Sequence, residues 1–229
     1  MNWGLRNRLD RVLSGLPEGK GSVMLAIDHG YFMGPTTGIE EPRKSIVPLL
    51  PQADSLMVSR GILQNTIPKR TNIPIVLRVS SGNSILNEDM SNEKLCVSIE
   101  DAIRLNASAV AFSIYIGGAF EHQTLVEFSK LVNDAHRYGI PVLAVTAVGK
   151  DMNRDLRYLS LASRIAVELG ADIVKTYYCE GFSELITSCP VPVVIAGGKK
   201  VPEAEALQLA QNAVNDGAAG VDMGRNIFQ

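Results

Sequence analysis

The sequence predicts an α/β fold of the (β/α)₈-barrel class, and three observations favour this class. Eight short runs rich in β-branched residues recur along the 229 residues, and most are apolar at consecutive positions. That pattern is typical of parallel strands that are covered on both faces. The runs begin roughly 20 to 35 residues apart, which leaves room for a crossover helix after each strand. Eight such units favour a closed barrel over an open doubly wound sheet.

The expected strands end in polar residues or in glycine, as strands do when their carboxyl ends form the mouth of a barrel. They cover residues 23–28, 55–59, 75–80, 109–115, 142–146, 172–176, 193–196 and 220–223.

Amphipathic helices are predicted between these strands. The clearest pattern covers residues 92–105, where Leu95, Ile99, Ala102 and Ile103 share one face and Ser91 can serve as the N-cap. Similar stripes cover residues 124–138, 155–169 and 202–216. Each of these three stripes is followed by a glycine, which suits the left-handed position that ends many helices. The glycines are Gly139, Gly170 and Gly217.

We expect a single domain over residues 1–229, because no linker or low-complexity stretch divides the chain. Residues 1–20 form an N-terminal segment whose amphipathic part, residues 5–13, is predicted to cap the bottom of the barrel. The chain ends at Gln229, shortly after the last expected strand. We therefore expect the last helix of the barrel to be absent from it.

Composition excludes several classes of function. The formal net charge of −2 lacks the basic excess of a nucleic-acid or anionic-membrane binder. The three cysteines form no CxxC pair, so neither a disulfide framework nor a zinc site is predicted. The N-terminus lacks the apolar run of a secretory signal, and no run reaches the length of a membrane span. We expect a cytoplasmic protein with no metal and no bound cofactor.

Lys175 is the most informative residue at the end of a predicted strand. The residues before it are strand-like and would carry the lysine into the barrel mouth, where barrel enzymes keep their reactive groups. Burial favours the neutral amine, which is the form that adds to a carbonyl. From the residues alone, a structural ion pair with Asp28 or Glu180 is an equal alternative to Schiff-base catalysis.

Two glycine turns follow the last two predicted strands, where such barrels commonly bind a phosphate. Glycine lets backbone N–H groups approach phosphate oxygens, and a basic side chain in the turn adds charge. Glycine in such a loop can also serve only to make the turn, but two turns in the expected places favour a phosphate site. Its candidate residues are Gly197, Gly198, Lys199, Gly224 and Arg225.

Asp28 and His29 end the first predicted strand and could polarise a substrate hydroxyl or carry a proton. A carboxylate and an imidazole together cover the acid and base roles near neutral pH. The alternative is a hydrogen-bonded pair that only closes the loop.

Several segments together resemble the DeoC/FbaB family of class I aldolases, and the likeness runs almost end to end. Within that family they are most similar to the thiolase branch that acts in autoinducer-2 breakdown. The segments are Ala26-Ile27-Asp28-His29-Gly30-Tyr31-Phe32, Gly34-Pro35-Thr36-Thr37-Gly38, Val148-Gly149-Lys150-Asp151-Met152, Ile173-Val174-Lys175-Thr176-Tyr177-Tyr178, Ile195-Ala196-Gly197-Gly198-Lys199-Lys200 and Asp222-Met223-Gly224-Arg225-Asn226-Ile227-Phe228-Gln229.

The resemblance implies a barrel with Lys175 as the Schiff-base residue, Asp28 at the end of the first strand, and phosphate bound by the two glycine turns. It also implies assembly into a homo-oligomer, either a pentameric ring or a decamer. The implied reaction transfers the acetyl group of 3-hydroxy-5-phosphonooxypentane-2,4-dione to the co-substrate coenzyme A, giving acetyl-CoA and dihydroxyacetone phosphate.

One departure from the family separates this reaction from an aldol cleavage. The related aldolases carry a tyrosine as proton donor after the fifth strand, where this chain has Thr146. Two alternatives stay open. One is a class I aldolase that acts on a phosphorylated sugar such as fructose 1,6-bisphosphate or a heptulosonate precursor. The other is a non-catalytic phosphosugar-binding protein.

Overall fold

The eight predicted strands form a closed parallel barrel in the computed structural model, which describes residues 2–14, 21–148 and 153–229. The predicted fold class is confirmed. In order around the barrel the strands are β1, β10, β9, β8, β7, β6, β3 and β2, so every neighbour in space is also a neighbour in the barrel repeat. Their bounds are β1 Ser22–Ala26, β2 Ser55–Ser59, β3 Ile75–Arg78, β6 Ala109–Ile116, β7 Val142–Val148, β8 Ile173–Tyr177, β9 Val193–Ala196 and β10 Gly220–Met223.

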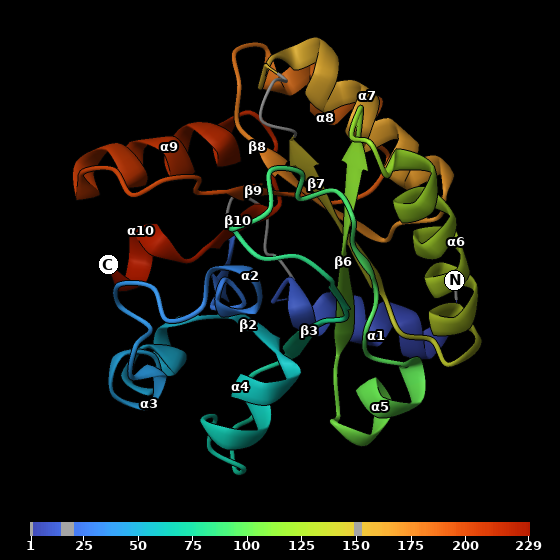
Figure 1. Cartoon of the computed structure of the whole chain (residues 1–229). Helices are drawn as coiled ribbons and strands as arrows, with labels where there is room; N and C mark the ends of the chain where they lie inside the picture. The colour runs from blue at the N-terminus through green and yellow to red at the C-terminus, as the bar shows by residue number, and fades with distance from the viewer. Residues whose placement is uncertain (1, 15–20, 149–152) are drawn as a thin grey trace.

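Helices surround these strands (Figure 1). The predicted stripes at 124–138, 155–169 and 202–216 form the three longest helices, α6, α7 and α9. Gly139, Gly170 and Gly217 have φ angles of +64°, +96° and +103°, as expected for residues that end helices. The helices are α1 Trp3–Val12, α2 Gly30–Met33, α3 Pro42–Ser45, α4 Arg60–Asn65, α5 Ile99–Arg104, α6 Glu121–Arg137, α7 Leu156–Glu168, α8 Phe182–Ser188, α9 Glu203–Asn215 and α10 Arg225–Phe228, with a 3-10 helix η1 at Val47–Gln52.

The helix predicted over residues 92–105 is wrong in its first half. Helix α5 begins only at Ile99 and is capped by Ser98, whose side chain accepts a hydrogen bond from the Asp101 amide. Upstream, Lys94–Leu95 forms a short strand, β5, that pairs antiparallel with β4 at Ser80–Ser81. Ser91 caps no helix and instead accepts a hydrogen bond from the amide of Phe120.

The barrel interior is a packed core and not a channel. Its lumen is filled by a cluster that takes alternate residues from the strands, while the intervening residues face the helices. Val12 and Leu13, at the end of α1, belong to the lumen cluster and are 0% and 5% exposed. The end of α1 thus packs into the lumen, while residues 15–20 of the predicted capping segment lie outside the described ranges.

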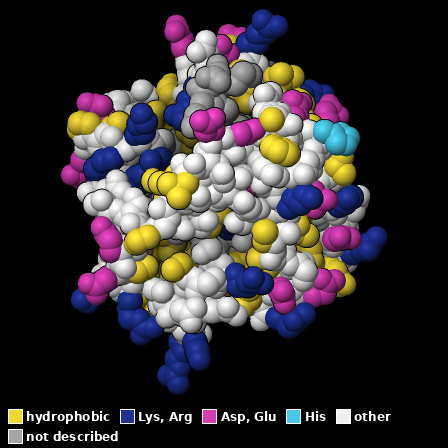
Figure 2. Space-filling view, in the orientation of Figure 1, with side chains coloured by type: hydrophobic (Ala, Val, Ile, Leu, Met, Phe, Trp, Pro, Cys, Tyr) yellow, Lys and Arg dark blue, Asp and Glu magenta, His cyan; other side chains and the backbone are white. Residues whose placement is uncertain are grey.

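Basic and acidic side chains are interspersed on the face shown in Figure 2, outside the grey atoms. That distribution agrees with the net charge of −2. None of the described helices has the length and apolarity needed to cross a membrane.

Candidate active site

The pleat of the strands carries polar residues into the barrel mouth. Side chains two apart on a strand point to the same face, so Asp28 continues the inward row of Met24 and Ala26. Lys175 follows Ile173, and Arg78 follows Val76, in the same way. The apolar lumen thus ends in a layer of charged side chains at the carboxyl ends of the strands.

These side chains line a cavity of about 160 Å³ at the mouth. Most of the residues predicted for the site line it, namely Asp28, His29, Lys175, Gly197, Gly198, Gly224 and Arg225. Lys199 is exposed and is not among the lining residues. Lys150, named in the same sequence motifs, lies outside the described residues.

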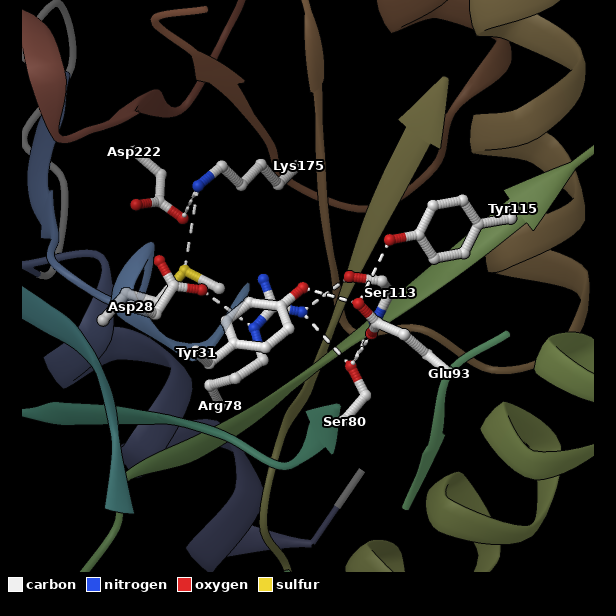
Figure 3. A network of polar contacts seen from close by, with 10 residues as sticks. Asp28, Tyr31, Arg78, Ser80, Glu93, Ser113, Tyr115, Lys175 and Asp222 are labelled. Atoms are coloured by element: carbon white, nitrogen blue, oxygen red, sulfur yellow. Dashed lines mark hydrogen bonds and ion pairs between the residues drawn. The ribbon is translucent and has the colours of Figure 1, made fainter. Parts of the chain in front are cut away.

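Lys175 is 9% exposed, and its ammonium nitrogen lies 3.0 Å from Oδ2 of Asp222 and 3.8 Å from Sδ of Met57. Its ion-pair partner is thus neither Asp28 nor Glu180. Figure 3 shows Lys175 and Asp222 pointing toward one another across the mouth.

Asp222 is fully buried in the middle of β10, and neither carboxyl oxygen has a well-aligned hydrogen bond within the described part of the chain. Burial raises the pKa of Asp222 above its ordinary value, and the attraction of Lys175 only partly opposes this effect. The geometry therefore places next to the amine a carboxyl group that holds a proton more readily than an exposed aspartate does.

The pKa of Asp28 is shifted in the opposite direction, although Asp28 is also buried. Burial alone would raise its pKa, but Arg78 and Lys175 outweigh that effect and hold the pKa below its ordinary value. The guanidinium Nε of Arg78 donates to Asp28 Oδ2 at 2.8 Å. Asp28 is therefore an ionised group that stabilises positive charge at Lys175, and it is a weak base near neutral pH.

Arg78 is held in turn by a buried polar network that is centred on Glu93 (Figure 3). Its Nη1 donates to Ser113 at 2.8 Å, and the Ser80 hydroxyl donates to Glu93 at 2.6 Å. Two phenols, Tyr31 and Tyr115, donate to Glu93 at 2.6 and 3.1 Å. Burial raises the pKa of both phenols, so they stay protonated and keep these bonds.

His29 is neutral in this environment, because burial lowers its pKa to about 4. Its Nδ1 is buried and has no hydrogen-bond partner within the described ranges. The ring is held edge-on against Phe228, with 5.9 Å between ring centroids. Of the two residues predicted to carry protons, His29 has the free nitrogen that this role needs.

The two glycine turns meet at one side of the cavity. A Cβ at Gly224 would lie 2.2 Å from the carbonyl oxygen of Ala26 and 2.4 Å from the His29 ring, so only glycine fits there. Gly198 has a φ of +68°. Asn226 ties the turns together, because its side chain donates to the carbonyl oxygen of Gly197 at 2.8 Å and accepts from the amide of Val201 at 2.9 Å.

Positive charge lies beside these turns. Nε of Arg225 is buried without a hydrogen-bond partner among the described residues, as expected for a donor that is kept for an anion. The Arg154 guanidinium lies over the Tyr177 ring at 3.7 Å from its centroid, next to Gly198.

Thr146 cannot act as the missing phenol in this geometry. It is 2% exposed, and its hydroxyl donates to the carbonyl oxygen of Lys175 at 3.1 Å.

Sequence reasoning missed several residues that the fold brings to the mouth. Arg78 and Asp222 carried a local signal, since each is a charged residue inside a short apolar strand. Glu93 carried no such signal in the sequence, because its position resembled the first turn of the helix predicted over residues 92–105. Within the described ranges, no group of three His, Cys, Asp or Glu side chains is placed to share a metal ion.

Two curated proteins similar to this chain share one description. A protein of Enterobacter sp. (strain 638) and one of Klebsiella pneumoniae are 58% and 57% identical to it over 230 aligned residues. Both alignments cover 100% of this chain and 77% of the relative. Each relative is described as a 3-hydroxy-5-phosphonooxypentane-2,4-dione thiolase.

Solved structures similar to this fold include an archaeal fructose-1,6-bisphosphate aldolase whose catalytic lysine is covalently bound to a carbinolamine intermediate. It superposes with a TM-score of 0.86 at 28% identity, over 98% of this chain and 92% of that chain. The family model for DeoC/LacD family aldolases matches residues 22–229. With the barrel, the lysine at its mouth and relatives above half identity, this chain belongs to the DeoC/LacD aldolase family.

Proposed function

We propose that this protein is a coenzyme A-dependent thiolase that acts on 3-hydroxy-5-phosphonooxypentane-2,4-dione. The observation that carries the proposal is Lys175, buried at the barrel mouth between Asp222 and Asp28 in a chain 58% identical to a protein described as that thiolase. The products are acetyl-CoA and dihydroxyacetone phosphate.

In the first step the Lys175 amine adds to the ketone next to the phosphorylated carbon. Asp222 gives a proton to the carbinolamine oxygen, which leaves as water, and an iminium ion forms. The ionised Asp28, held by Arg78, stabilises the positive charge of that ion.

The iminium ion then acts as an electron sink. The thiol of coenzyme A adds to the acetyl carbonyl and passes its proton to the neutral His29, and the bond between the acetyl carbon and the hydroxyl-bearing carbon breaks. Acetyl-CoA leaves, and the electron pair of the broken bond forms an enamine on Lys175. His29 returns a proton to the enamine carbon, and water hydrolyses the resulting iminium to release dihydroxyacetone phosphate.

The phosphate binds to the N–H groups of the turns at Gly197, Gly198 and Gly224, with Arg225 supplying the charge. The position of the phosphate fixes which ketone reaches Lys175.

We also propose a homo-oligomer, a pentameric ring or a decamer, which sedimentation of the purified protein would distinguish from a monomer.

The decisive assay is acetyl-CoA formation from the phosphorylated dione. Consumption of the dione should depend strictly on coenzyme A, and breakdown that is indifferent to coenzyme A would refute the thiolase function.

Borohydride reduction in the presence of dihydroxyacetone phosphate should add a stable mass to the peptide that contains Lys175, and should add none in Lys175→Ala. Labelling at Lys150 or Lys199 instead would overturn the lysine assignment. Asp222→Asn, which keeps the shape of the side chain, should slow the labelling.

A class I aldolase is the second candidate, favoured by the structural likeness to the archaeal aldolase. Aldol cleavage must remove a proton from an alcohol, whereas thiol cleavage of a β-dicarbonyl begins at a carbonyl. The Thr146 hydroxyl donates its hydrogen bond to the Lys175 carbonyl oxygen and so cannot serve as the base for an alcohol. We therefore expect negligible cleavage of fructose 1,6-bisphosphate. Thr146→Tyr should lower thiolase activity by crowding the mouth. Efficient aldolase turnover by the wild-type protein would favour the aldolase.

A further inference from the structure

A second and larger cavity opens beside the catalytic one. It measures about 480 Å³ and lies between the segment after β1 and the start of α4. Apolar residues make up much of its wall, among them Ile27, Ile39 and Ile62. Tyr31 lines this cavity and the catalytic cavity alike, so one aromatic side chain belongs to the walls of both.

The catalytic cavity leaves little space for a second substrate. Its volume of about 160 Å³ is below the range of about 300–1,000 Å³ that is typical of small-molecule sites. The neighbouring cavity of about 480 Å³ lies within that range. A thiol that reacts beside Lys175 must carry its chain outside the catalytic cavity, and the neighbouring cavity adjoins it.

Two glycines in the wall of the larger cavity are not explained by the fold. Gly30 lies in α2 and Gly61 in α4, where glycine is less stable than alanine. Neither has a positive φ, and a Cβ at either position would meet nothing within 4 Å. These glycines thus relieve neither a clash nor backbone strain, and both are exposed in the wall of the cavity, where a side chain would take up open space.

We propose that this cavity holds the pantetheine arm of coenzyme A, with the thiol directed past Tyr31 toward Lys175. The proposal rests on the thiolase function proposed above. An apolar wall with a few polar groups suits an uncharged chain with two amides. Asn65 and Ser59 supply such polar groups at the lining.

The charges at the rim agree with this orientation. Arg43 and Arg60 are exposed on the elements that border the cavity, and Arg43 donates to the carbonyl oxygen of Asn65 at 3.0 Å. In this proposal the two guanidinium groups, of which that of Arg60 also lies 3.7 Å from Asp101, attract the phosphates of the nucleotide end outside the cavity. The one acid in the lining, Glu40, already accepts a hydrogen bond from the Gly38 amide.

The test places a larger side chain at Gly61, so that it occupies part of the cavity. Gly61→Leu should raise KM for coenzyme A by about 10-fold or more, because its side chain occupies the space of the arm. KM for the dione and borohydride labelling of Lys175 should not change. Ala204→Leu, which adds bulk on the exposed face of α9, is the matched control and should leave all of these values unchanged. Gly61→Ala, whose methyl group meets no neighbour, should fold as the wild type and show a smaller rise in the same direction.

Free pantetheine as the thiol substrate tests which part of coenzyme A occupies the cavity. If the arm occupies it, Gly61→Leu raises KM for pantetheine by the same factor as for coenzyme A. A rise for coenzyme A alone would place the nucleotide end there and overturn the proposal, as would an unchanged KM for coenzyme A in folded Gly61→Leu. Absence of coenzyme A-dependent turnover in the wild type would instead refute the thiolase function itself.

Discussion

Two buried aspartates of the mouth have pKa values shifted in opposite directions because their partners differ. Asp28 accepts a hydrogen bond from a guanidinium at 2.8 Å, whereas among the described residues the ion-pair partner of Asp222 is the ammonium of Lys175. A buried carboxylate without aligned donors is costly, so the pKa of Asp222 is raised, while that of Asp28 is lowered and Asp28 stays ionised. One pocket thereby places around one amine a carboxyl group that holds its proton more readily and another that stays ionised.

Arg225 and Lys199 should differ sharply in their effect on phosphate binding, although both were predicted from the same glycine turns. Arg225→Ala should raise KM for the phosphorylated dione by roughly 10- to 150-fold, since a hydrogen bond to a charged group contributes about 1.5–3 kcal/mol. Lys199→Ala should have a much smaller effect, because Lys199 is exposed and outside the cavity lining. Steady-state kinetics of both variants would measure this, and equal effects would contradict the assignment.

His29 should make stability depend on pH. The folded protein keeps His29 neutral down to about pH 4, whereas in the unfolded chain it is protonated below its ordinary pKa of 6.5. Between these values the unfolded state binds more protons, so the free energy of unfolding should fall as pH decreases from 6.5 toward 4, by at most about 3 kcal/mol. Denaturation at pH 7 and pH 5 should show a smaller fall in His29→Asn, and the full wild-type fall in the control His122→Asn, at an exposed position.

Among the elements, the segment between β4 and α5 contributes most to the mouth beyond the barrel repeat itself. It pairs as β5 with β4 and places Glu93 beside three hydroxyl donors near Arg78. The helix predicted here does not form in its first half. There the buried Glu93 carboxylate instead accepts hydrogen bonds from three hydroxyl groups.

Removal of that carboxylate should loosen the whole segment. Glu93→Ala leaves the hydroxyls of Tyr31, Tyr115 and Ser80 buried without their acceptor, and we expect a loss of about 3–5 kcal/mol in the free energy of unfolding. Urea denaturation would measure it. Glu88→Ala, at an exposed position of the same segment, is the control and should stay within about 0.5 kcal/mol of the wild type. An equally small effect at Glu93 would show that the network does not hold the segment.

Over the whole molecule, the apolar closure of the barrel and its charged layer lie at opposite ends. Helix α1 closes the amino-terminal end with Val12 and Leu13, and the charged layer lies at the carboxyl end.

Leu13→Ala should therefore cost about 2–5 kcal/mol in stability, because it leaves a cavity in the barrel core. KM for the dione should hardly change at a temperature where the variant is folded. Leu207→Ala, at a side chain that is 65% exposed, is the control for stability. A large change in KM without loss of stability would show that the two ends are coupled.

The sequence alone determined the eight strands, the barrel class and the lysine at the mouth, because apolar runs and the period of the strands are local properties. It also placed both glycine turns, since barrel topology assigns the ends of strands to one face. Only the tertiary structure decided that Lys175 pairs with Asp222, that Arg78 and Glu93 join the site, and that Lys199 stays outside the cavity lining. Those outcomes depend on which side chains meet across the barrel, from positions as far apart as Asp28 and Arg78, and on the competition between burial and charge there.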